Sequence, residues 1–155
     1  MSIYLFALLI GVIAGLRAMT APAAVSWAAH LGWLPLEGSW AAFMGYRFTP
    51  YVFTALALIE LVTDQLPGTP SRKVPQQFGA RIVSGAFCGA ILGMPAGAWV
   101  GGLIAGAVGA AIGTLGGYEA RKRLVLATGG RDFPIAILED AVAIIGALLV
   151  VSAVA

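Results

Sequence analysis

The hydrophobic positions of this chain fall in long uninterrupted blocks. In an amphipathic helix of a soluble protein, apolar residues recur at i, i+3 and i+4 with polar residues between them. Here five segments are apolar on all sides, and each is close to the roughly 20 residues that a helix needs to cross a bilayer. They cover residues 2–19, 50–66, 78–94, 96–118 and 134–155. The pattern predicts an all-α, polytopic transmembrane helix bundle of about five spans.

A further apolar stretch, residues 21–36, follows the first segment. Thr20 and Pro22 interrupt the first helix at this point, because proline lacks an amide and clashes with the preceding turn. We therefore expect a broken or re-entrant helix near residues 20–36. Were this stretch a sixth span, both termini would lie on the same side of the membrane.

Composition supports lipid as the main solvent of one integral membrane domain, residues 1–155. Hydrophobic residues make up 60% of the 155 and charged residues only 10%, against roughly 25% charged residues in a soluble domain. The first block lacks the charged start and cleavage site of a secretory signal, which indicates a retained helix. Cys88 is the single cysteine, so no internal disulfide can form.

Basic residues set the expected orientation of the chain in its membrane. Seven of the nine fall in or beside the connections after the second and fourth segments: Arg72, Lys73, Arg81, Arg121, Lys122, Arg123 and Arg131. Cytoplasmic loops gather such charges. With five spans both connections are cytoplasmic, the amino terminus is cytoplasmic, and Arg17 and Arg47 lie toward the opposite face. The net charge of +2 then reflects topology and not nucleic-acid binding.

Glycine gives the strongest packing signal. In the third and fourth segments glycines recur at four-residue steps, at Gly85, Gly89, Gly93, Gly97 and Gly101. Helices in lipid associate largely through close contact of such small-residue faces. The spacing predicts a glycine zipper between these helices, with Pro95 at the joint, and it favours packing over a substrate channel.

Several charged residues lie inside the expected spans. Glu60 and Asp64 are four residues apart and share a helix face, while Glu139 and Asp140 lie about a turn inside the last segment and Arg81 opens the third. A charge at the bilayer centre costs about 2.5–3.5 kcal/mol on insertion scales, so such residues pair or line a hydrated path. Two interpretations stay open: structural ion pairs between Arg81 and an acid, or a path for a small solute or ion.

The break near Arg17, Thr20 and Pro22 belongs to the same candidate path. Irregular backbone at membrane depth is tolerated only inside protein or beside water, and transporters use broken helices to hold ions. The alternative for Arg17 is that its side chain reaches the outer surface from the end of the first segment.

Other chemistry is sparse. Ser71, Arg72 and Lys73, in the polar connection after the second segment, could contact a lipid head group or phosphate; the alternative is a basic loop that only sets orientation. The chain has one histidine and no HExxH, G-x-S-x-G or Walker motif. We therefore expect no enzyme, no catalytic residues, no metal site and no cofactor.

Four strings carry a family resemblance: GLRAMTAPAAVSWAAHLGWL, ELVTDQLPGTPSRKVPQQFGARIVSGAFCGA, GTLGGYEARKRL and LEDAVAIIGALL. In them the chain resembles small bacterial membrane proteins catalogued as domain of unknown function 4126. The resemblance implies an integral membrane protein and brings no activity with it. The strings contain the candidate path residues Arg17, Glu60, Asp64, Arg81, Glu119 and Glu139.

The leading hypothesis is a homo-oligomeric transporter or channel for a small solute or ion, because charge is dense inside the expected spans. The alternative is a non-transporting scaffold or lipid-binding protein that uses these charges to join helices. An enzyme acting on lipid-linked substrates is least favoured, since no nucleophile and base are paired in the sequence.

Overall fold

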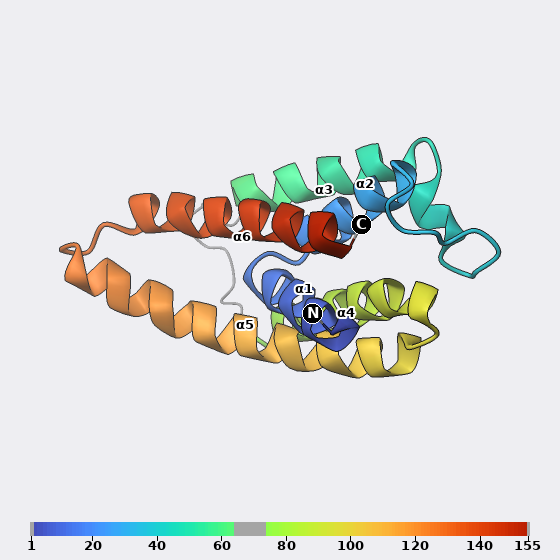
Figure 1. Cartoon of the computed structure of the whole chain (residues 1–155). Coiled ribbons are helices and arrows are strands. Elements are labelled where there is room, and N and C mark those ends of the chain that lie inside the picture. The colour runs from blue at the N-terminus through green and yellow to red at the C-terminus, as the bar shows by residue number, and fades with distance from the viewer. Residues whose placement is uncertain (1, 64–73, 155) are drawn as a thin grey trace.

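The structure, a computed structural model, describes residues 2–63 and 74–154, and the chain is entirely helical in regular structure there. These residues form six α-helices, whose arrangement Figure 1 shows. They are α1 (Ile3–Leu16), α2 (Thr20–His30), α3 (Thr49–Thr63), α4 (Pro75–Gly93), α5 (Trp99–Ala127) and α6 (Asp132–Val154). Two short 3₁₀ turns, η1 (Ala42–Gly45) and η2 (Met94–Ala96), complete the described elements. The prediction of an all-helical fold is confirmed for these residues.

The sequence explains where several helices begin and end. The Ser2 side chain accepts a hydrogen bond from the Tyr4 amide and caps α1. Pro75 opens α4, at a position where its missing amide is not needed. Between α4 and α5 the chain turns through η2, which contains Pro95, and through Gly97 with φ of 70°. Pro95 therefore lies at the predicted joint.

Helix α5 is longer than expected. The sequence placed its end at residue 118, but it continues to Ala127, so the basic residues Arg121, Lys122 and Arg123 lie on helix and not in a loop. No proline or glycine occurs between Gly117 and Gly129, and the residues there are mostly good helix formers. Gly129 and Gly130, with φ of 76° and 88°, end the helix.

The first helix is broken, and α1 and α2 form a hairpin. Helix α1 ends at Leu16 and α2 begins at Thr20. Helix α1 runs antiparallel to α6, because Arg17 contacts Asp140 and Ile13 lies beside Gly146. Helix α2 then runs back toward the end where α1 began (Figure 1). We call residues 17–19, between the two helices, the hairpin tip.

Successive helices of the bundle alternate in direction. Helix α2 is antiparallel to α3, since the Met19 amide meets Glu60 and the Trp27 indole meets Thr54. The start of α1 and the end of α6 lie toward one end of the bundle, and the connection from α5 to α6 lies at the other (Figure 1).

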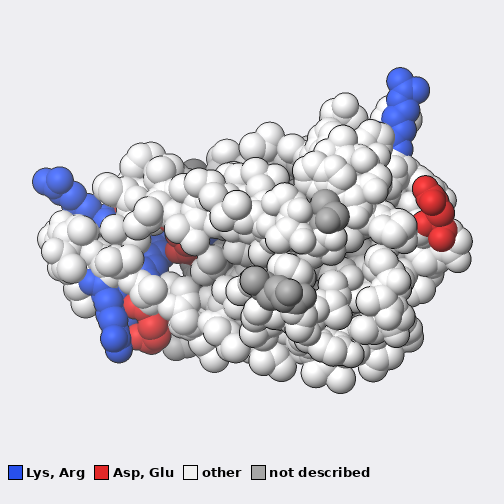
Figure 2. All heavy atoms as spheres, in the orientation of Figure 1, with Lys and Arg blue, Asp and Glu red and all other residues white. Residues whose placement is uncertain are grey.

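Three helical segments are long and apolar enough to cross a membrane: Pro75–Ala96, Trp99–Ala127 and Asp132–Val154. Helices α1 and α3 are apolar but shorter. In the face that Figure 2 shows, charged side chains gather at the two ends of the molecule, and the surface between them is nearly free of charge. These features suggest a membrane protein.

The backbones of α1, α4 and α5 come into contact at glycines. A Cβ atom added to Gly106 of α5 would overlap the carbonyl oxygen of Gly85 on α4, and one added to Gly11 of α1 would overlap the carbonyl oxygen of Gly106. Farther along the α4–α5 pair, Gly89 and Gly102 meet in the same way. We call these five residues the glycine contact. No side chain larger than hydrogen fits at its centre.

Candidate functional site at the hairpin tip

Arg17 is the centre of a buried charge cluster. Its side chain has no exposed surface and lies against the start of α6. The Nε atom donates to Asp140 Oδ1 at 2.7 Å, and Nη1 donates to Glu139 Oε1 at 3.0 Å. Both carboxylates are also buried, with 9% and 7% of their residue surfaces exposed. One guanidinium thus meets two carboxylates, and charge-assisted hydrogen bonds of this kind are among the strongest in proteins.

This arrangement corrects the expected position of Arg17. The five-span interpretation put Arg17 at the face opposite the basic connections, where its side chain would reach outward. Because α1 stops at Leu16 and α2 turns back, Arg17 instead lies level with Glu139 and Asp140. The prediction put Arg17 and the two acids at opposite faces because it treated the first segment as a complete span.

Side chains from other helices bind the backbone of the tip and of the last turn of α1. Arg81 Nη1, from α4, donates to the carbonyl oxygens of Gly15 and Leu16 at 2.8 Å each. Ser84, one turn farther along α4, donates to the Ala18 carbonyl at 2.5 Å. Polar backbone groups that a helix end leaves unpaired need such partners.

Glu60 of α3 completes the set of helices around the tip. Its Oε2 atom accepts a hydrogen bond from the Met19 amide at 3.1 Å. The predicted residues Arg17, Glu60, Arg81, Glu139 and Asp140 are therefore brought together around the tip, from the α1–α2 break and from α3, α4 and α6.

The tip lies well inside the bundle. Arg81 is the seventh residue of α4 and Glu139 the eighth of α6, so the tip is about 9–10 Å along the axis from the starts of these helices at 1.5 Å per residue. Irregular backbone at such a depth in a membrane is stable only when protein or water satisfies it. In this structure Ser84 donates to the Ala18 carbonyl and Glu60 accepts from the Met19 amide.

Arg121 of α5 links this cluster to the bundle end. It donates two hydrogen bonds to the Asp132 carboxylate, at 2.9 and 2.7 Å, and its Nη1 atom is 3.9 Å from Glu139 Oε2. A cleft of about 160 Å³ separates α5 from α6 here, and Arg121, Glu139 and Leu16 are among the residues that line it. Figure 2 shows charged atoms at a hollow in this part of the surface.

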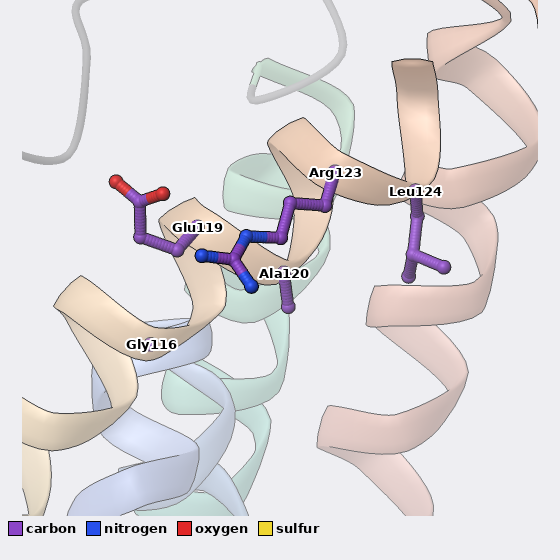
Figure 3. Close-up of a pocket in the computed structure, with 5 residues that line it drawn as sticks. All are labelled: Gly116, Glu119, Ala120, Arg123 and Leu124. Carbon is purple, nitrogen blue, oxygen red and sulfur yellow. The ribbon is translucent and has the colours of Figure 1, made fainter. Parts of the chain in front are cut away.

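The remaining predicted residues divide into two groups. Thr20 and Pro22 lie in the first turn of α2, buried beside the tip. Glu119 is exposed on the outer side of α5, away from the tip, in a shallow hollow with Arg123, which is one turn farther along the helix (Figure 3). Asp64 and the predicted head-group contacts Ser71, Arg72 and Lys73 lie outside the described residues.

Sequence reasoning missed two members of the site. Ser84 is three residues after Arg81, a spacing that puts both on one helix face, and this signal in GARIVSGA would have found it. Arg121 was assigned to a loop, and only the longer α5 brings it to Asp132 and Glu139.

The chemistry available at the tip is charge pairing. Among the residues that the structure describes, no group of three or more His, Cys, Asp or Glu side chains could hold a metal ion. Protonation of a carboxylate, or competition by another ion, would change which groups pair with Arg17. Such a change would also alter the tip, because Arg17 Nη1 donates to the Leu16 carbonyl at 2.9 Å.

Comparison with known proteins returned no match, neither to a family model, nor to a curated protein, nor to a solved structure. The resemblance to the uncharacterised membrane family stays a prediction.

Proposed function

We propose that this protein is a membrane-embedded transporter or channel for a small ion, and that the hairpin tip with Arg17, Glu139 and Asp140 is its ion-responsive site. The observation that carries the proposal is the burial of one guanidinium and two carboxylates against irregular backbone inside the bundle. Broken helices with charged side chains are how transporters hold ions at membrane depth.

Stability alone explains this cluster poorly. Burying charges has a desolvation cost that their attraction often fails to exceed, and apolar residues of similar volume can serve as well or better. A bilayer raises that cost further. Five charged residues around one tip are therefore better explained by a role in which ions bind or exchange.

The proposed orientation in a bacterial inner membrane follows from the alternating helices. The basic end of the bundle, with the α5–α6 connection, faces the cytoplasm under the positive-inside rule. Because α1 starts at the opposite end, this proposal puts the amino terminus outside, together with the carboxyl terminus, and so departs from the cytoplasmic amino terminus that the five-span interpretation predicts. The α1–α2 hairpin then enters from outside and turns back within the membrane, and α3, α4, α5 and α6 cross it.

The glycine contact would hold the hairpin against α4 and α5 in this proposal. Close backbone approach strengthens van der Waals packing, which drives the association of helices in lipid, where no hydrophobic effect presses them together. A homo-oligomer would supply more of the wall of a pathway, since a single chain with one short hairpin encloses little volume.

Ion flux in proteoliposomes tests the proposed site. The purified protein is placed in vesicles that hold pyranine, and proton flux is followed after a potassium gradient with valinomycin sets the membrane potential; a chloride electrode follows anion release in parallel. We expect flux above that of empty vesicles, and a loss of at least tenfold in Glu139→Gln and in Asp140→Asn. Both substitutions keep side-chain volume and remove a charge that pairs with Arg17.

Asp132→Asn is the matched control, because Asp132 lies on the same helix but its side chain is 58% exposed and pairs with Arg121. Its flux should equal that of the wild type. Wild-type vesicles that match empty vesicles in both assays would contradict the proposal. Folded Glu139→Gln and Asp140→Asn proteins with unchanged flux would contradict the assignment of the site.

A non-transporting scaffold is the second candidate function. It is favoured by the side-chain bonds to the tip from Arg81, Ser84 and Glu60, which lock the backbone in one conformation. In a scaffold, the substitutions at Glu139 and Asp140 would lower the unfolding temperature in detergent, and no ion would shift that temperature.

A further inference from the structure

A hollow of about 210 Å³ opens between α2, α3 and α6, on the side of the hairpin away from the glycine contact. Its floor is made of alanines, and Ala24, Ala57 and Ala147 are each at most 8% exposed. Its rim includes Leu58 and Leu148, which are 58% and 54% exposed on the outside of the bundle. The hollow therefore opens toward the surroundings of the bundle, and small side chains from three helices create it.

One polar group in this hollow lacks a partner. Thr20, at the start of α2, lines it and is 7% exposed, and within the described part of the chain its hydroxyl makes no hydrogen bond. A buried polar group left unpaired costs free energy, so such a group requires an explanation. Thr54, which lines the hollow beside Trp27 and about two helical turns from Thr20, accepts a hydrogen bond from Trp27 Nε1 at 2.8 Å and, as a hydroxyl, can still donate one.

We propose that this hollow binds a small uncharged molecule that has a ring-sized apolar body and one hydroxyl group. The volume suits such a ligand, because an apolar cavity of about 150 Å³ is enough for benzene. The hydroxyl of the ligand would pair with Thr20, while its ring would lie on the alanines. This site adjoins the charge cluster at Thr20 but shares none of its charged residues, and it would exist in a transporter or in a scaffold.

Two other occupants fit less well. Water needs two to four polar partners, but Trp27 and Thr54 already pair with each other about 10 Å along α2 from Thr20, at 1.5 Å per residue. The other walls of the hollow are apolar. A lipid acyl chain would fill the volume but leave the Thr20 hydroxyl unpaired. A ligand with an apolar ring and one hydroxyl group fits both the shape and the polarity of the hollow.

Fluorine NMR of the full-length protein in nanodiscs tests this proposal with two matched probes, 4-fluorophenol and 4-fluorotoluene, which differ in one polar group. The wild type should bind 4-fluorophenol about 5–10-fold more tightly than 4-fluorotoluene, as one added hydrogen bond allows. In Thr20→Val, which keeps the shape and removes the hydroxyl, this preference should vanish. The Thr20→Val protein should also unfold at the same or a higher temperature without ligand, because it buries no unpaired hydroxyl.

Two substitutions on α6 separate binding in the hollow from partition into lipid. Ala147→Leu fills the floor and should abolish saturable binding of both probes, whereas Ala153→Leu, at an exposed alanine of the same helix, should bind as the wild type does. Saturable binding that survives in Ala147→Leu would overturn the site. An equal preference for 4-fluorophenol in the wild type and in Thr20→Val would overturn the role of Thr20. Binding of 4-fluorotoluene as tight as that of 4-fluorophenol to the wild type would identify an apolar chain as the occupant and overturn the proposed ligand class.

Discussion

The glycine contact and the hairpin tip hold the same α1–α2 hairpin by opposite means. At the glycine contact, Gly11 and Gly106 bring two backbones together, and a Cβ atom added to either glycine would meet backbone atoms first. The tip consists of three residues outside the helices. There, side chains from α3, α4 and α6 bind the backbone or Arg17.

This difference determines what each region tolerates. Protein interiors are close-packed, so the glycine contact has no volume to spare and should respond to size. The tip depends on paired charges and hydrogen bonds, so it should respond to the loss of a partner more than to a change of volume. A protein whose hairpin moves during function would be expected to keep the first region rigid and to place its switchable interactions in the second.

Gly106→Val should have the largest effect, because it tests the glycine contact at its centre. The new side chain would overlap the Gly85 carbonyl, and two helix backbones would have to separate. Overpacking a core usually costs about 1–3 kcal/mol, and a clash of backbone on both sides should exceed this range and abolish the folded bundle. Size-exclusion chromatography and circular dichroism in detergent measure the outcome.

The matched control on the same helix is Gly116→Ala. A Cβ atom at Gly116 meets nothing within 4 Å, so alanine should stabilise α5 by up to about 1 kcal/mol through its higher helix propensity. A Gly106→Val protein that folds with wild-type stability would show that α1, α4 and α5 do not need to touch at this point.

Arg17→Met should have the second-largest effect and tests the tip. It keeps most of the side-chain volume but leaves Glu139 and Asp140 without the guanidinium that they share. Loss of one partner from a buried ion pair costs about 3–5 kcal/mol, and thermal unfolding in detergent would record it. The variant with Arg17→Met, Glu139→Gln and Asp140→Asn together should recover much of this loss, because it buries no charge. If it recovers none, the packing of Arg17 and not its charge stabilises the tip.

Local chemistry in the sequence predicted most helices and their breaks. Long apolar blocks gave α1, α3, α4, α5 and α6, and Thr20 and Pro22 marked the interruption after α1. The glycines at four-residue steps lie where α4 meets α5, although their role in stabilising the bundle in lipid stays a prediction. The end of α5 was misplaced, since basic residues were taken as a loop signal although they favour helix.

The geometry of the tip could be predicted only in part. Apolar surroundings made Arg17, Glu60, Arg81, Glu139 and Asp140 conspicuous, so the members of the cluster were found. Their pairing was not, because it depends on whether the chain continues or reverses after Leu16, and the sequence around Ala18 and Met19 permits both. The direction of one short helix therefore decided which residues meet Arg17.

Asp132→Asn should have the smallest effect, because it tests an exposed ion pair outside the buried charge cluster. Asp132 pairs with Arg121 through two hydrogen bonds, but its side chain is 58% exposed. Exposed ion pairs contribute about 0–1 kcal/mol, so the unfolding free energy should fall by less than that amount, and by still less in 1 M salt, which screens exposed charges. The loss in Arg17→Met should change less with salt, because a buried pair is screened much less than an exposed one. A large, salt-insensitive loss in Asp132→Asn would mean that Arg121 and Asp132 are part of the buried network and that the tip extends to the end of the bundle.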